Sequence, residues 1–195
     1  MNVLCPCRGA ASVDCYCSSV GPIALTDVLP GDEPDFMQCL ESGEVQRTTG
    51  RIPHPYLQSD AEWWVNFNIT GAAERGRTYN FAIRLQTAQQ NVIGIIGINE
   101  INSRVAEIGY WIAPLYWGRG IMPSCISSFT RFIKDRRVEY GVDALEAHVF
   151  EGNDRSGRAL QKAGFSFIER LPDFYMIREV KLTALRYRLD IASPC

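Results

Sequence analysis

The sequence has no long apolar run, no block of basic residues and only two histidines. Its apolar stretches fall well short of the roughly 20 residues that a membrane-spanning helix needs, so no membrane segment is expected. The first residues lack the apolar stretch of a secretory leader, which favours a cytoplasmic protein. Because the net charge is only −2 and Lys/Arg-rich runs are absent, we expect no nucleic-acid partner. His54 and His148 form no set with a nucleophile and an acid, and each is expected to be structural.

The cysteines do not form a metal-binding pattern either. There are seven, an odd number, and in a cytoplasmic protein they are expected to be reduced. Four of them form the pairs Cys5/Cys7 and Cys15/Cys17, but zinc sites usually leave two or more residues between paired ligands. We therefore expect no metal and interpret residues 1–20 as a disordered N-terminal tail. A metal-binding protein built on these pairs is the alternative.

From Gly21 onward the spacing of apolar residues predicts one α/β domain. Strands are predicted at residues 22–28, 78–85, 92–99, 104–113, 144–150, 165–169 and 180–189. Helices are predicted at residues 32–42, 59–74, 121–140 and 153–163. This order is typical of a mixed α/β domain in which helices cover a central sheet.

The second predicted helix carries its own start signal and an aromatic cluster. Ser59 is expected to be its N-cap, with Glu62 three residues later completing a capping box. Trp63, Trp64 and Phe67 form its apolar face, and we expect these rings to pack in the core.

The segment around Gly118 and Gly120 has the composition of a phosphate-binding turn. A strand ends at Pro114, a short Gly-Arg-Gly loop follows, and a helix begins near Pro123, which suits the first helical turn. The start of a helix offers unpaired backbone N–H groups and a partial positive charge. Glycines let a phosphate approach the backbone, and Arg119 adds a positive side chain. The patterns of nucleoside-triphosphate and dinucleotide sites are absent.

Two segments resemble the GNAT N-acetyltransferases, and most closely their RimJ/RimL-like branch. The first, at residues 109–122, is Gly-Tyr-Trp-Ile-Ala-Pro-Leu-Tyr-Trp-Gly-Arg-Gly-Ile-Met, which resembles the acetyl-CoA motif. The second, at residues 153–165, resembles the branch's Asn-x-x-Ser helix that ends in Gly-Phe. Met122 departs from the usual Gly or Ala. Leu160 stands where many members of the superfamily carry a tyrosine acid, although this branch commonly has an aliphatic residue there.

The resemblance implies a fold, a reaction and a partner. It implies an N-acetyltransferase domain over residues 21–192, with a central mixed sheet of about six to seven strands flanked by about four helices. Acetyl-CoA would be the acetyl donor, and the acceptor would be a primary amine on a protein N-terminus or a small molecule, attacking directly. The alternative is a catalytically impaired module that still binds acyl-CoA. The protein would be a monomer or a homodimer.

The residues expected to contact acetyl-CoA lie in these two segments. The amides of Trp111 to Ala113 are expected to bind the pantetheine arm, and the glycine turn is expected to bind the diphosphate. The full set is Trp111, Ile112, Ala113, Trp117, Gly118, Arg119, Gly120, Ile121, Met122 and Asn153.

Amine acetylation needs a base and an acid. An ammonium must lose a proton before it attacks, and the departing thiolate benefits from a donor. Glu107, on the strand that leads to the turn, is the candidate base, with Glu100 as the alternative. Ser156 is the candidate acid. The acceptor is expected to meet loops near residues 50–59 and 171–181, because such loops carry specificity.

Overall fold

The structure, a computed structural model, describes residues 13–18, 21–86, 90–177 and 179–192. Within these ranges the chain forms eight strands and five α-helices. The strands are β1 (Val13–Ser18), β2 (Gly21–Asp27), β3 (Asn80–Leu85), β4 (Val92–Asn102), β5 (Val105–Ile112), β6 (Ala144–Phe150), β7 (Ser166–Ile177) and β8 (Val180–Asp190). The α-helices are α1 (Glu33–Leu40), α2 (Gln58–Arg75), α3 (Ile121–Asp135), α4 (Arg137–Tyr140) and α5 (Asp154–Lys162).

All eight strands described belong to one mixed sheet. Their order is β1-β2-β3-β4-β5-β6-β8-β7, and only the β5/β6 pair is parallel. The predicted mixed α/β fold is confirmed, with β1 in addition to the predicted elements and with the helix predicted at residues 121–140 divided into α3 and α4. None of the described helices is both long and apolar enough to cross a membrane.

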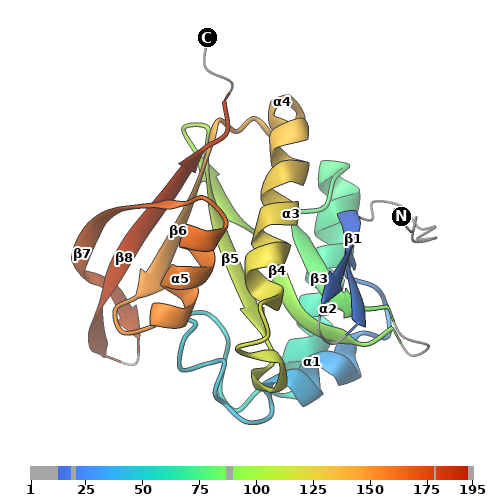
Figure 1. Ribbon diagram of the computed structural model, residues 1–195. Helices are drawn as coiled ribbons and strands as arrows, with labels where there is room; N and C mark the ends of the chain where they lie inside the picture. Colours follow the sequence, from blue (N-terminus) through green and yellow to red (C-terminus); the bar gives the residue numbers. More distant parts are fainter. Residues whose placement is uncertain (1–12, 19–20, 87–89, 178, 193–195) are drawn as a thin grey trace.

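Helices cover both faces of the sheet (Figure 1). On one face, α3 and α5 pack Phe129 and Leu160 into the largest apolar cluster, which also contains Ile96 of β4. On the other face, α1 and α2 pack against Ile95 of the same strand. The continuous apolar run of β4 is therefore buried on both sides, as a central strand requires.

The sheet opens in its middle, between β5 and β6. These parallel strands pair only at Val105↔Ala144, Ala106↔Leu145 and Glu107↔Glu146. Beyond Glu107 they diverge toward the end of the molecule where α3 and α5 begin (Figure 1). The remaining residues of β5 therefore keep one edge unpaired by a strand.

The structure corrects two predictions near the N-terminus. Residues 13–18 of the expected tail form β1, which pairs antiparallel with β2, whereas Cys5 and Cys7 lie outside the described residues. Helix α2 begins at Gln58, so Leu57 and not Ser59 is its N-cap residue. Asp60 stabilises this end, because its Oδ2 accepts the backbone N–H of Leu57 at 2.8 Å. The described part of the chain holds no group of three or more His, Cys, Asp or Glu side chains suited to a metal.

The aromatic cluster of α2 was predicted as core, which is wrong for two of its three rings, whereas Trp64 packs against the apolar cluster beneath α1 and α2. Trp63 is 62% exposed and Phe67 is 42% exposed. Ala61, Val65 and Asn68 are the residues that α2 buries, and this spacing turns the two exposed rings outward. The rings stack on each other instead, with centroids 5.2 Å apart.

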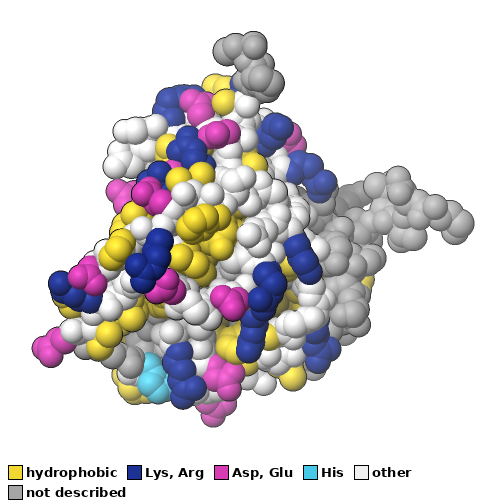
Figure 2. All heavy atoms as spheres, turned by 60° about the vertical axis from the view of Figure 1, so that its left-hand side comes forward, with side chains coloured by type: hydrophobic (Ala, Val, Ile, Leu, Met, Phe, Trp, Pro, Cys, Tyr) yellow, Lys and Arg dark blue, Asp and Glu magenta, His cyan; other side chains and the backbone are white. Residues whose placement is uncertain are grey.

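The β7–β8 hairpin, at the end of the sheet, has a mixed surface (Figure 2). Exposed apolar side chains such as Ile168 and Met176 alternate there with ion pairs. Arg170 binds Glu151, and Lys181 binds Asp173, both on the surface. This hairpin is longer than predicted because β7 continues to Ile177, through irregular pairing, past the expected end at residue 169.

Candidate active site

The turn from β5 into α3 is open at its glycines. Gly118 has φ +75° and Gly120 has φ +74°, a left-handed conformation that glycine adopts without strain. A Cβ atom placed on either residue would meet no heavy atom within 4 Å. In the described chain no acceptor takes the N–H groups of residues 118–120, and no side chain caps α3. The backbone here can therefore receive an anion.

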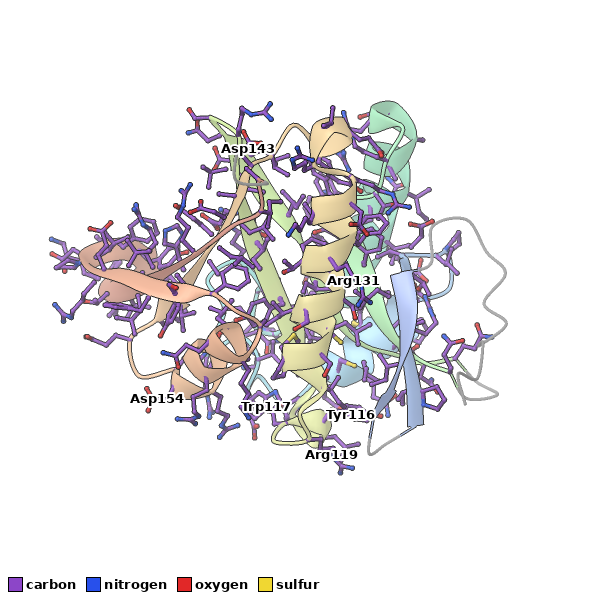
Figure 3. All side chains as sticks on the ribbon, turned by 45° about the horizontal axis from the view of Figure 1, so that its top comes forward. Tyr116, Trp117, Arg119, Arg131, Asp143 and Asp154 are labelled. Carbon is purple, nitrogen blue, oxygen red and sulfur yellow. The ribbon has the colours of Figure 1, made fainter. Side chains whose placement is uncertain are left out.

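Side chains of two elements meet around this turn. Arg119 lies at the tip of the turn, and Asp154, the first residue of α5, lies at the same end of the molecule (Figure 3). Arg155 of α5 stacks its guanidinium over the Trp117 ring, 4.8 Å from the ring centroid. The indole N–H of Trp117 donates to the carbonyl oxygen of Ile112 at 2.8 Å, which ties the turn to the end of β5. Two arginines thus flank the open amides with positive charge.

Ile121 and Met122 contribute their backbone rather than their side chains. The Ile121 side chain is buried in the core, and Met122 packs against the same cluster. The departure of Met122 from the usual Gly or Ala therefore adds a side chain to the core.

Only part of the expected pantetheine contact is available. The N–H of Ala113 donates to Ile93 O on β4 at 2.8 Å, so this amide is already engaged. Peptide groups alternate in direction along a strand, so the amide of Trp111 also points toward β4 and that of Ile112 points to the open edge. Of the three amides predicted, the one at Ile112 faces the opening.

Ser156 meets a tyrosine that the sequence analysis missed. The hydroxyl oxygens of Tyr110 and Ser156 lie 2.7 Å apart in a hydrogen bond. Asn153 caps α5, as predicted, because its Oδ1 accepts the backbone N–H of Ser156 at 3.3 Å. Burial raises the pKa of the Tyr110 hydroxyl, which therefore stays protonated at neutral pH and can donate a hydrogen bond. The position of Tyr110 beside the glycine motif was the only signal for it in the sequence.

Glu107 is held by two hydrogen bonds from distant parts of the chain. Asn99, at the irregularity in β4, donates to Oε1 at 3.1 Å, and His148 Nδ1 lies 3.1 Å from Oε2. The hydrogen bond from His148 holds the pKa of the Glu107 carboxyl below its ordinary value, although burial opposes this. Glu107 is therefore a carboxylate at neutral pH. His148, predicted to be structural, is part of this site.

Aromatic side chains surround His148. Its ring centroid lies 4.5 Å from that of Phe174, and Phe150 lies 5.2 Å from Tyr175. Burial, followed by the charge of Glu107, raises the pKa of Tyr175 to about 12.

The two segments expected to meet the acceptor converge at these rings, although most of residues 171–181 belong to the β7–β8 hairpin and not to a loop. A Cβ atom placed on Gly50 would lie 3.1 Å from Ile177 and 3.5 Å from Phe150. The first loop therefore rests on the end of β7 and on the end of β6.

Glu107 and Tyr110 lie on opposite faces of the sheet. They are three residues apart on β5, and side chains alternate along a strand. Tyr110 packs on the face covered by α3 and α5, whereas Trp111, which shares the face of Glu107, packs against Phe36 of α1. A group that enters between β5 and β6 would thus meet the Tyr110–Ser156 pair on one side and Glu107 on the other.

Three carboxylates lie in register across the strands on the Glu107 face. Glu100 of β4 is opposite Glu107, and Glu146 of β6 is next to it on the other side. Glu146 pairs with Arg188 at 2.8 Å, while no described residue forms an ion pair with Glu100. Because Arg188 neutralises Glu146, Glu100 and Glu107 are the two carboxylates of this row that are available to a cationic ligand.

Known proteins resemble the chain in sequence and in fold. Over 150 residues it is 28% identical to the uncharacterized N-acetyltransferase YoaA of Bacillus subtilis (strain 168), with 73% of this chain and 78% of the relative covered. RimL, a ribosomal L7/L12 alpha-N-protein acetyltransferase solved with coenzyme A, has a TM-score of 0.76 at 16% identity, covering 92% of this chain and 98% of that one. Mycobacterium smegmatis RimJ, solved with a CoA-disulfide, has a TM-score of 0.77 at 17% identity, covering 92% and 87%.

A third structure and a family model complete the comparison. The microcin C7 self-immunity acetyltransferase MccE, solved with acetyl-CoA and AMP, has a TM-score of 0.75 at 16% identity, covering 86% of this chain and 92% of that one. At such identities the structures support the fold alone. The model of the acetyltransferase (GNAT) domain, however, matches residues 23–166, well over half of the chain. The chain therefore belongs to the GNAT family of acetyltransferases.

Proposed function

We propose that this acetyltransferase transfers the acetyl group of acetyl-CoA, the donor that its family uses, to a primary amine. The observation that carries the proposal is the opening between β5 and β6, which joins three features. The unoccupied amides of the glycine turn suit a diphosphate, the hydroxyl pair of Tyr110 and Ser156 suits a leaving thiolate, and Glu107 suits an amine.

The glycine turn between β5 and α3 suits the diphosphate of acetyl-CoA. Gly118 and Gly120 leave the space that a phosphate needs, and Arg119 and Arg155 supply the countercharge. Gly118, Arg119, Gly120, Ile121 and Met122 would hold the diphosphate through their backbone and through the arginine side chain, whereas the N–H of Trp117 already donates to Pro114 O at 3.0 Å. Ile112 and Asn153 would bind the arm that leads into the opening. The donor supplies the activated acetyl group, and the chain orients it.

The acceptor is proposed to enter from the Glu107 face. An ammonium is attracted by the carboxylates at positions 100 and 107, and it must lose a proton there before it can attack. The ribosomal L7/L12 alpha-N-protein acetyltransferase among the structural neighbours supports a protein N-terminus as the acceptor, and a small-molecule amine is the second acceptor class.

A thiol-release assay with acetyl-CoA and a panel of primary amines and peptides tests the reaction. We expect thiol release that depends on the amine, with one acetyl group found on the amine by mass spectrometry for each thiol released. Tight binding of acetyl-CoA without turnover on any amine would instead favour the acyl-CoA-binding module.

Replacing Glu107 with glutamine is expected to lower kcat by about 10- to 100-fold at pH 7.5, because the carboxylate on the acceptor side of the opening, which is hydrogen-bonded to His148, is lost. The KM for acetyl-CoA should change much less, since the glycine turn is unaltered. Steady-state kinetics on the best amine measure both constants. Glu100→Gln is the comparison, and a larger loss in that variant would assign the role to Glu100.

Replacing Tyr110 with phenylalanine is expected to lower kcat by about tenfold, because the hydroxyl pair that protonates the thiolate is reduced to Ser156 alone. An activated thioester with a better leaving group needs less protonation, so the same variant should be less impaired on such a donor. An equal loss on both donors would contradict the acid role.

A further inference from the structure

His148 and Glu107 have the geometry of a base and the acid that orients it. His148 Nδ1 lies 3.1 Å from Glu107 Oε2, and the histidine side chain is only 10% exposed. The ring is held in this orientation by Phe174, whose centroid lies 4.5 Å away. A histidine fixed by a carboxylate on one nitrogen is an arrangement that enzymes use for proton transfer on the other.

The hydrogen bond also fixes the tautomer of the imidazole. An ionised carboxylate can only accept a hydrogen bond, so in this contact Nδ1 of His148 carries the proton. The lone pair of a neutral ring then lies on Nε2, which has no hydrogen-bond partner in the part of the chain that the structure describes. Glu107 itself is a weak base, because its pKa is held below the ordinary value of a carboxyl group.

Resting on the proposed function, we infer that Nε2 of His148 takes the proton from the amine acceptor and that Glu107 is a positioning residue that orients the imidazole. This assigns His148, rather than Glu107, as the catalytic base.

Charged groups of both signs lie near the imidazole. Glu107 of β5 stabilises the imidazolium. Arg186 of β8 is the cross-strand partner of His148 and adds a positive charge there. This arginine forms an ion pair with Glu169 of β7, with Nη1 and Oε1 3.2 Å apart. Tyr175 is uncharged at neutral pH. Arg51, whose charge also acts on Glu107, opposes protonation.

The proton balance of the step closes. The ammonium gives one proton to Nε2, the free amine forms a bond to the acetyl carbon, and the bond from this carbon to sulfur breaks. The thiolate takes a proton from the Tyr110–Ser156 pair, which recovers one when the new amide loses its second proton. His148 releases its proton to solvent, so one proton is produced for each turnover.

The test compares His148→Ala with Glu107→Gln in the full chain. In His148→Ala we expect kcat to fall by about 100-fold or more, with little change in the KM for acetyl-CoA. Added imidazole should restore a substantial part of this rate in His148→Ala and none in Glu107→Gln. The loss of rate toward low pH should persist in Glu107→Gln and disappear in His148→Ala.

Two results would overturn the inference. One is a His148→Ala variant that keeps the acid limb of the wild-type pH profile and does not respond to imidazole. The other is a Glu107→Gln variant that loses this limb. Either result, obtained while the wild-type protein acetylates an amine, leaves the proposed function intact. Absence of wild-type turnover would count against the proposed function itself.

Discussion

Replacing Gly120 with glutamate is expected to weaken acetyl-CoA binding by about 100-fold or more. A carboxylate about 5 Å from a diphosphate costs about 3 kcal/mol at an effective dielectric constant of 20, which corresponds to more than two decades in Kd. The new side chain would occupy the space in front of the open amides, where a Cβ atom meets no neighbour. Isothermal titration calorimetry with acetyl-CoA measures the loss.

Two control variants separate this effect from backbone strain. Gly120→Ala places a side chain in the unfavourable left-handed conformation but adds no charge. This variant should therefore lose far less affinity for acetyl-CoA. Gly76→Glu introduces the same charge at φ +65° beyond the end of α2, also in open space, and should bind acetyl-CoA like the wild type. Wild-type affinity in a folded Gly120→Glu variant would remove the diphosphate from this turn.

Replacing Asp32 with alanine is expected to destabilise the fold by about 3 kcal/mol or more, because it leaves a buried guanidinium without its counterion. Arg84 and Asp32 are each 7% exposed at their side chains and form two hydrogen bonds, of 3.0 and 2.8 Å. The same aspartate accepts the backbone N–H of Leu29. Chemical denaturation monitored by circular dichroism measures the change in unfolding free energy.

The matched control is a bidentate pair on the surface. Arg170 donates to both carboxylate oxygens of Glu151, at 2.6 and 2.8 Å, but the two side chains are about half exposed. Because solvent screens such pairs, Glu151→Ala should change stability far less than Asp32→Ala. Equal effects in the two variants would show that burial does not determine the contribution of the Arg84–Asp32 pair.

The sequence predicted the fold where a local signal was strong. The apolar run of β4, the change of period at Ile121 and the cap at Asn153 each correspond to an observed element. The family assignment, made on the glycine turn and the second motif, is confirmed by the domain model. The roles of the site residues and the cytoplasmic location stay predictions.

What the sequence could not predict depends on contacts between distant residues. His148 and Glu107 are 41 positions apart and meet only because parallel β5 and β6 place them side by side. Tyr110 and Ser156 are 46 positions apart. The exposed rings of Trp63 and Phe67 were misjudged because aromatic residues at helical spacing do not reveal which side of a helix the sheet will occupy.

The three-residue pairing of β5 with β6 has a mechanical consequence. The sheet is nearly divided into two parts, β1 to β5 and β6 to β8, which are joined only by the short parallel pairing that ends at Glu107. A donor whose pantetheine arm lies along the unpaired edge of β5 would connect the two parts of the sheet where β5 and β6 form no hydrogen bonds with each other. Cohesion between the halves would then rise with substrate occupancy, so that the loaded enzyme is the more rigid body and the empty one is looser along this line.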